Sequence, residues 1–94
     1  DTPLVLSFGG SLGAAPLNDA MFDILKENAE SGEAYHIHSV GTNGKDYLKK
    51  FEAEGFKKKS DTVLVKGKSE VRLYIDNMDT CMAAADLVVG RAGA

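Results

Sequence analysis

Leu4-Val5-Leu6-Ser7-Phe8, followed at once by Gly9-Gly10-Ser11-Leu12-Gly13-Ala14, is the stretch that decides the fold. Its first five residues form a nearly continuous apolar run, which is typical of a strand buried on both faces of a parallel sheet. The glycines that follow let the chain turn sharply. Apolar residues then recur at three- and four-residue steps from Leu17 to Ala29, which predicts a helix with Pro16 in its first turn. Together these features predict the opening of a βαβ unit.

The rest of the chain continues the alternation of strands and helices. The expected elements are a strand at 34–40, a helix around 47–51 that ends near Gly55, β-rich stretches at 62–65 and 71–75, a helix capped by Asp76 or Asn77 that carries Met78, Met82 and Ala85 on one side, and a strand at 87–89. Strands that alternate with helices of this length imply a parallel sheet. The sequence therefore predicts the α/β class, with a Rossmann-like parallel sheet and flanking helices.

Two further expectations follow from this order of elements. Lys66-Gly67-Lys68-Ser69 either turns a hairpin, the one antiparallel exception that we expect, or forms a plain loop. Ligands of such sheets bind beyond the carboxyl ends of the strands. The candidate binding segments are therefore the four that follow predicted strands, at 9–14, 41–44, 74–78 and 90–94.

Composition excludes several classes of protein. The 94 residues are 44% hydrophobic and 27% charged, with a net charge of -3, as in ordinary soluble domains. No apolar run approaches the ~20 residues of a membrane span. The lysine run Lys57-Lys58-Lys59 lies in a basic middle section, but it lacks interleaved aromatic residues, so we expect a solvated loop and helix face and no nucleic-acid partner. Cys81 is the only cysteine, which favours a reducing cytoplasm and a buried, inert thiol.

The glycine loop allows three interpretations. Glycines before a helix N-terminus suit phosphate, because free N–H groups and positive partial charge meet there. The loop is neither a Walker P-loop nor the dinucleotide fingerprint, in which Ser11 and Ala14 would both be glycine. Gly9, Ser11 and Gly13 do match the nucleophile elbow of α/β-hydrolases, but the chain is too short for that fold, and the acids between Ser11 and the two histidines are residues of the predicted helix. A tight turn without a ligand is the third interpretation.

The two histidines do not indicate a metal site. His36 and His38 lie two residues apart, so they share one face of the predicted strand. Two ligands are too few for zinc, and Cys81 is distant in sequence. We expect a structural or surface role for both imidazoles, and neither a metal nor another cofactor.

Two segments together resemble a known family. The first runs from Leu6 to Ala14 and continues with Leu17-Asn18; the second is Tyr74-Ile75-Asp76-Asn77-Met78, followed by Ala83-Ala84-Ala85-Asp86-Leu87-Val88-Val89-Gly90-Arg91-Ala92-Gly93-Ala94. This pair is similar to the C-terminal domain of the MurG family, bacterial transferases that use UDP-N-acetylglucosamine. The similarity is firm at both ends of the chain and loose across 42–70.

The resemblance implies a set of substrate-binding residues. The loop at 9–14 would face the diphosphate, with Ser11 contacting UDP. The segment 74–78 would bind uracil, with the backbone of Ile75 reading the base edge, and 91–94 would border the sugar-diphosphate. The implied binding residues are Gly9, Gly10, Ser11, Leu12, Gly13, Tyr74, Ile75, Met78, Arg91, Ala92, Gly93 and Ala94. No catalytic residue is implied for this chain.

The resemblance also implies an activity. Residues 1–94 would form part of the nucleotide-sugar-binding C-terminal domain of a GT-B glycosyltransferase. The whole enzyme would be a UDP-N-acetylglucosamine-dependent hexosyltransferase that converts lipid I to lipid II in peptidoglycan synthesis. It would lie on the cytoplasmic face of the plasma membrane, contacting it through an N-terminal domain. The 94 residues alone would be inactive.

Departures from the family pattern and alternatives remain. Leu12 replaces a residue that is polar in many members, Pro16 interrupts the run after Ala14, and 57–69 does not align convincingly. Another lipid-directed GT-B transferase, or a free-standing flavodoxin-like binding module, is the alternative; a receiver domain is disfavoured because no acid follows the first strand until Asp19. Both ends look cut, so we expect part of a larger protein whose uncovered apolar surface promotes self-association.

Overall fold

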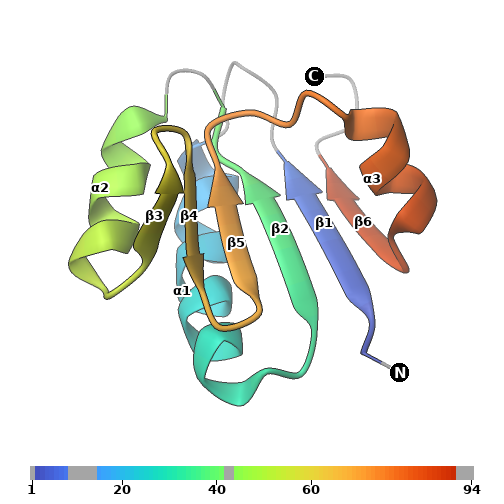
Figure 1. Ribbon diagram of the computed structural model, residues 1–94, viewed down its shortest axis with the longest axis horizontal. Helices are drawn as coiled ribbons and strands as arrows, with labels where there is room; N and C mark the ends of the chain where they lie inside the picture. The colour runs from blue at the N-terminus through green and yellow to red at the C-terminus, as the bar shows by residue number, and fades with distance from the viewer. Residues whose placement is uncertain (1, 9–14, 42–43, 91–94) are drawn as a thin grey trace.

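The computed structural model describes residues 2–8, 15–41 and 44–90. Within them the chain alternates strands and helices as the sequence predicts, with one additional strand (Figure 1). The elements are β1 (Leu4–Phe8), α1 (Ala15–Ser31), β2 (Tyr35–Ser39), α2 (Lys45–Ala53), β3 (Lys57–Ser60), β4 (Val63–Lys66), β5 (Ser69–Arg72), α3 (Met78–Ala84) and β6 (Leu87–Gly90). Pro16 lies in the first turn of α1, where its missing N–H has no partner to lose.

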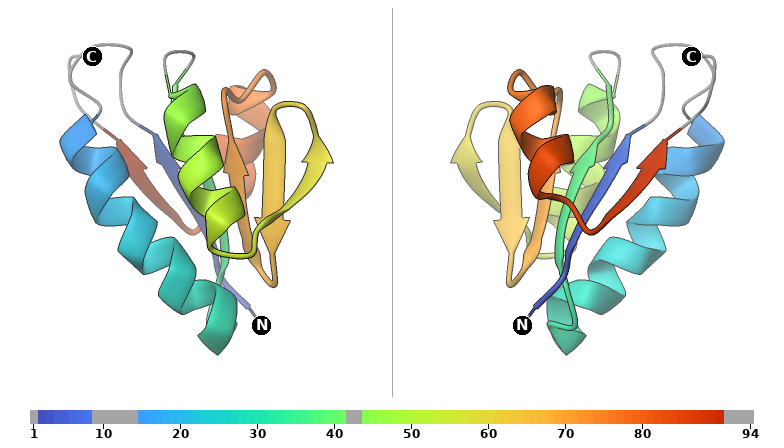
Figure 2. Two further views of the ribbon diagram at one scale, coloured as in Figure 1. Left: turned by 90° about the vertical axis from the view of Figure 1, so that its left-hand side faces the viewer. Right: turned by 90° about the vertical axis from the view of Figure 1, so that its right-hand side faces the viewer.

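The six strands form one mixed sheet in the order β3-β4-β5-β2-β1-β6. β5, β2, β1 and β6 run parallel to one another, whereas β4 is antiparallel to both β3 and β5. Helices α1 and α2 lie on one face of the sheet, and α3 lies on the other (Figure 2). The predicted Rossmann-like α/β fold is therefore confirmed. The stretch around Gly67 turns a hairpin, one of its two predicted forms, and the pairing of β3 with β4 is a second antiparallel exception that the sequence did not predict.

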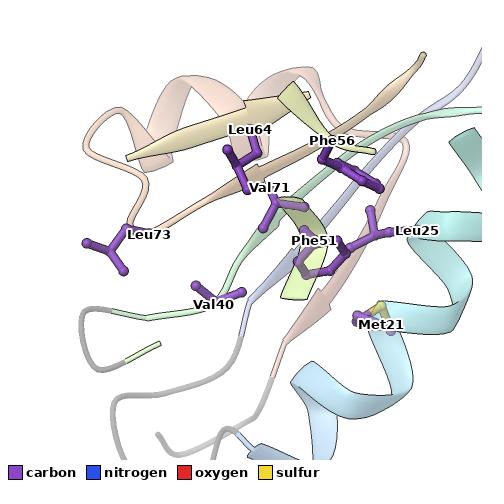
Figure 3. Packing of buried hydrophobic residues seen from close by; sticks show 8 residues of the cluster. All are labelled: Met21, Leu25, Val40, Phe51, Phe56, Leu64, Val71 and Leu73. Atoms are coloured by element: carbon purple, nitrogen blue, oxygen red, sulfur yellow. The ribbon is translucent and has the colours of Figure 1, made fainter. Parts of the chain in front are cut away.

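An apolar cluster fills the space between the sheet and the two helices on its first face. Phe51 of α2 is fully buried, and its ring makes edge-on contacts with Phe22 and Phe56 at centroid distances of 4.8 and 5.0 Å. Side chains from α1, α2, the strands and the connecting segments converge there (Figure 3). The buried members are Met21, Leu25, Val40, Phe51, Phe56, Leu64, Val71 and Leu73. Burial of this cluster supplies the main apolar driving force of the fold.

Two sequence predictions about local structure are wrong. Lys57-Lys58-Lys59 is not a loop and helix face but most of strand β3, whose side chains are all exposed at the edge of the sheet. Residues 73–75, which were expected to be part of this strand, lie outside β5. The last pairs of β5 join Arg72 to Ser39 of β2 and to Val63 of β4, so the strand ends there. The predicted burial of Cys81 is confirmed: among the described side chains of α3 it is the buried one, while Met82 is 44% exposed.

Gly67 marks the closest approach of the β4–β5 turn to helix α1. Its φ of +58° is left-handed, and a Cβ there would lie 2.7 Å from the carbonyl oxygen of Ala29. Only glycine meets both conditions without strain.

Among the helices of the described residues, none is long and apolar enough to cross a membrane.

Candidate nucleotide-binding site

The strands that precede the four candidate segments end at the same edge of the sheet. The parallel register pairs Phe8, the last residue of β1, with both Ser39 of β2 and Gly90 of β6, and it pairs Ser39 with Arg72 of β5. These strands therefore end in one row (Figure 1), and in the sequence the candidate segments 9–14, 41–44, 74–78 and 90–94 lie at or just after these strand ends. This is the edge at which parallel α/β sheets bind their ligands.

Nine of the twelve sequence-predicted binding residues lie outside the described residues. They are Gly9, Gly10, Ser11, Leu12, Gly13, Arg91, Ala92, Gly93 and Ala94. Of the other three, Tyr74 is 48% exposed, Ile75 is half-buried, and Met78 begins α3. The tyrosine ring is thus accessible at the site edge, in a segment that follows β5.

The segment that carries Tyr74 and Ile75 is fixed at both ends. Before it, Arg72 donates from Nε to Glu70 Oε2 at 2.6 Å and from Nη1 to Asn77 Oδ1 at 3.4 Å. After it, Asn77 occupies the N-cap position of α3, as predicted, although its side chain makes no capping hydrogen bond. Its backbone oxygen instead accepts the N–H of Cys81 at 3.1 Å.

The ends of β1 and β6 are in close contact. A Cβ at Gly90 would lie 2.9 Å from the ring of Phe8, so the aromatic side chain occupies the space that a larger residue would need. Glycine at this position lets the last residues of the two strands pack side by side. The segments 9–14 and 91–94 therefore start from neighbouring, tightly packed positions.

A buried chain of polar side chains lies directly beneath this edge. Ser7 Oγ lies 2.7 Å from His36 Nε2 and 2.8 Å from His38 Nδ1. His38 Nε2 lies 2.8 Å from Asn18 Oδ1, and Asn18 Nδ2 donates to the carbonyl oxygen of Val40 at 3.0 Å. All four side chains are at most 4% exposed, so the network excludes water.

Burial keeps both imidazoles neutral. Loss of hydration lowers the pKa of His36 to about 4. The pKa of His38 is also lowered to about 4, by burial first and by the proximity of His36 second, while a hydrogen bond to the backbone of Ser7 opposes the shift. The shared face and the structural role that the sequence predicts for the two histidines are both confirmed. In the described residues no group of three or more His, Cys, Asp or Glu side chains could hold a metal ion.

Sequence reasoning missed the partners of the histidines. Ser7 interrupts an otherwise apolar strand, and Asn18 is a polar residue at the start of an amphipathic helix; each was a visible signal of a buried hydrogen bond. Ser7 and His38 form a hydroxyl–imidazole pair like that of a serine nucleophile and its base. Both are fully buried, however, so a substrate has no access to them and the pair is structural.

The fold and the position of the candidate site define a Rossmann-like α/β domain whose ligand edge carries a glycine-rich loop. The sequence profile of the glycosyltransferase family 28 C-terminal domain matches residues 4–94. The chain belongs to this family.

Individual relatives agree with the family assignment. Three are named UDP-N-acetylglucosamine–N-acetylmuramyl-(pentapeptide) pyrophosphoryl-undecaprenol N-acetylglucosamine transferase. The Myxococcus xanthus protein is 38% identical over 96% of this chain, the Porphyromonas gingivalis protein 39% over 100%, and the Burkholderia vietnamiensis protein 41% over 96%. The chain spans only 21%, 22% and 23% of their respective lengths. No solved structure matches the chain.

Proposed function

We propose that this chain forms the UDP side of the donor site of a glycosyltransferase. The diphosphate would lie against 9–14, uracil against 74–78, and the sugar-diphosphate beside 91–94. The observation that carries the proposal is the row in which Phe8, Arg72 and Gly90 end their strands, because it starts all three segments from one edge.

Helix α1 supports the placement of the diphosphate. It is 17 residues long and begins at Ala15, directly after the glycine loop. Its first turn contains no acidic residue, so nothing on that turn offsets the positive end of the helix dipole. Free N–H groups at such an end bind phosphate, and the glycines of the loop allow the backbone to approach it closely.

The segment after β5 supports the placement of uracil. Among the described residues none forms a backbone–backbone hydrogen bond with Ile75, and we propose that its N–H and C=O pair with the edge of a base. The exposed ring of Tyr74 lies next to it in sequence and can wall the base. This segment thus offers directional hydrogen bonds together with an aromatic surface, which is what recognition of a base needs.

For the whole protein we propose the reaction in the names of the relatives. It would transfer N-acetylglucosamine from UDP-N-acetylglucosamine to lipid I and form lipid II, at the cytoplasmic face of the membrane. Phosphate-facing N–H groups would stabilise the UDP leaving group as charge develops. The 94 residues alone would bind the donor but not transfer the sugar, because the chain spans less than a quarter of those relatives.

Calorimetric titration of the 94-residue chain tests the proposed donor site. We expect UDP to bind weakly and at least tenfold more tightly than UMP, because the second phosphate is the group that the loop holds. Gly13→Leu should abolish this preference without unfolding the protein. Equal affinity for UDP and UMP, or no effect of Gly13→Leu, would overturn the proposal.

Self-association is a second proposed property. Among the described strands β6 pairs with β1 alone, and its Leu87 and Val88 side chains are 55% and 38% exposed. Apolar side chains beside an unpaired strand edge favour contacts between copies. Sedimentation velocity should show association that rises with concentration and falls in Leu87→Lys; a monomer at all concentrations would contradict it.

A further inference from the structure

One imidazole connects the two ends of the glycine loop. Ser7 lies two residues before Gly9, and Asn18 lies four residues after Ala14. His38 of β2 contacts both: its Nδ1 lies 2.8 Å from Ser7 Oγ and its Nε2 lies 2.8 Å from Asn18 Oδ1. A side chain that is 31 residues from the first contact and 20 from the second therefore links β1 to α1 across the loop.

The direction of every hydrogen bond in this link can be deduced. The carbonyl of Val40 only accepts, so Asn18 turns its NH₂ toward Val40 and its Oδ1 toward His38. His38 must then carry its proton on Nε2 and accept at Nδ1, so the hydroxyl of Ser7 donates to it. Ser7 Oγ in turn accepts from His36 Nε2–H. One tautomer satisfies all the bonds, and in the described residues no buried side-chain polar atom lacks a partner.

We propose that His38 is a positioning residue for the glycine loop, holding the end of β1 and the first turns of α1 at the separation at which the loop binds a diphosphate. The inference rests on the proposed donor site. His38 is fully buried and touches no substrate, so it would act through Ser7 and Asn18 alone. In a site that excludes water such bonds are strong, and breaking one leaves a buried partner unpaired.

His36 offers a matched control within the same strand. It lies on the same face of β2, is 4% exposed, and contacts the same Ser7 hydroxyl at 2.7 Å. No described hydrogen bond joins His36 to Asn18. His36 therefore contacts the residue on the β1 side of the loop and does not link β1 to α1. If burial and polarity alone mattered, His36 and His38 would be equivalent; if the link matters, only His38 affects the loop.

The test compares His38→Leu with His36→Leu in the 94-residue chain. We expect His38→Leu to lower the affinity for UDP at least fivefold. The same variant should shift the ligand-free amide signals of Gly10, Ser11 and Gly13. His36→Leu should change UDP affinity less than twofold. His38→Gln, whose amide can accept from Ser7 and donate to Asn18, should restore affinity to within about twofold. If His38→Leu does not fold, Asn18→Leu breaks the same link from the side of α1 and should show the same loss.

Separate outcomes identify which idea fails. If the unmodified chain does not distinguish UDP from UMP, the proposed donor site is wrong, and the ligand-free amide shifts still test the link. If UDP binds as proposed but His38→Leu and His36→Leu weaken it equally, or His38→Leu leaves both affinity and loop signals unchanged, the positioning role is wrong. Failure of His38→Gln to restore affinity would also contradict it.

Discussion

A single row of side chains across the sheet passes from an apolar region to a polar one. Directly opposed residues place Leu64 of β4, Val71 of β5, His38 of β2 and Ser7 of β1 next to one another on one face. All four are at most 2% exposed. The first two pack against α1 and α2 in the apolar cluster, and the last two belong to the hydrogen-bonded network beneath the loop. Burial is equal, but the kind of contact differs.

The difference separates two tasks. Apolar contacts are non-directional, so many side chains of suitable volume could fill the region around Phe51 and stabilise the fold. Hydrogen bonds fix distances and angles, so the network of Ser7, His38 and Asn18 determines where β1 and α1 lie relative to each other. The directional contacts lie at the edge where we propose that UDP binds.

Acid should lower the free energy of unfolding through the two histidines of the polar region. Both histidines have pKa values of about 4 in the folded chain, against 6.5 when unfolded. Above pH 6.5 both are neutral in either state. Between pH 6.5 and 4 the unfolded chain takes up protons that the folded chain does not, so the free energy of unfolding should fall by up to ~3 kcal/mol for each histidine. Urea denaturation at several pH values measures this.

A control assigns the acid effect to the network. The double variant His36→Gln and His38→Gln removes both titrating groups, so its stability should fall much less between pH 6.5 and 4. An unchanged pH profile in this variant would show that other groups cause the loss.

Truncating a side chain of the apolar region should lower the free energy of unfolding without a direct effect on UDP binding. Phe51→Ala removes a fully buried ring, which typically costs about 3–5 kcal/mol. Ile24→Ala on α1 is the control, because Ile24 is 46% exposed and should cost well under that amount. Urea denaturation gives both values. A loss below about 1 kcal/mol for Phe51→Ala would mean that the core is not packed as described.

Two buried serines sharpen the comparison. Ser7 and Ser69 lie on the same sheet face and are both fully buried; Ser69 Oγ donates to Leu25 O at 2.8 Å, away from the glycine loop. Each serine-to-alanine substitution should lower stability by about 1–3 kcal/mol, because buried partners lose a hydrogen bond. Only Ser7→Ala should also lower the affinity for UDP, which calorimetry measures. Equal effects on UDP would mean that the polar region has no special role.

The smallest expected effects concern two glycines with positive φ. Gly67→Ala should destabilise by about 1–3 kcal/mol, because its Cβ would meet the Ala29 carbonyl at 2.7 Å in addition to the backbone strain. Gly41 has a φ of +92° but nothing within 4 Å of its Cβ, so Gly41→Ala should cost less. Thermal unfolding compares the two. The opposite order would contradict the close approach of the hairpin to α1.

Sequence patterns predicted the strands and helices that carry apolar residues and missed β3, which carries none. The runs that became β1, α1 and β2 carry apolar periodicity, because tertiary packing imposes it. Strand β3 has none: Lys57–Ser60 are all exposed, and only its backbone pairing with β4 makes it a strand. The end of β5 at Arg72 depends on where neighbouring strands stop, which local sequence does not encode.

The candidate site was predicted from motifs, and its supporting network was not. Gly9, Ser11 and Tyr74 were selected by resemblance to a family pattern. The bonds of His38 to Ser7 and Asn18 join residues 31 and 20 positions apart, so only the fold brings them together. Two histidines on one strand face could be predicted. Ser7 and Asn18 were recognisable as polar residues within apolar patterns, but the sequence does not show that they pair with these histidines.

Residue-resolved NMR during a UDP titration of the unmodified chain tests the central claim most directly. The account predicts that amide signals shift first at Gly10, Ser11 and Gly13 and next at 74–78, while Phe51, Phe56 and Leu64 in the apolar region stay unchanged. UMP should produce the second set with little of the first. Shifts confined to the exposed lysines of β3, or spread equally over both regions, would contradict the division between a binding edge and an apolar core.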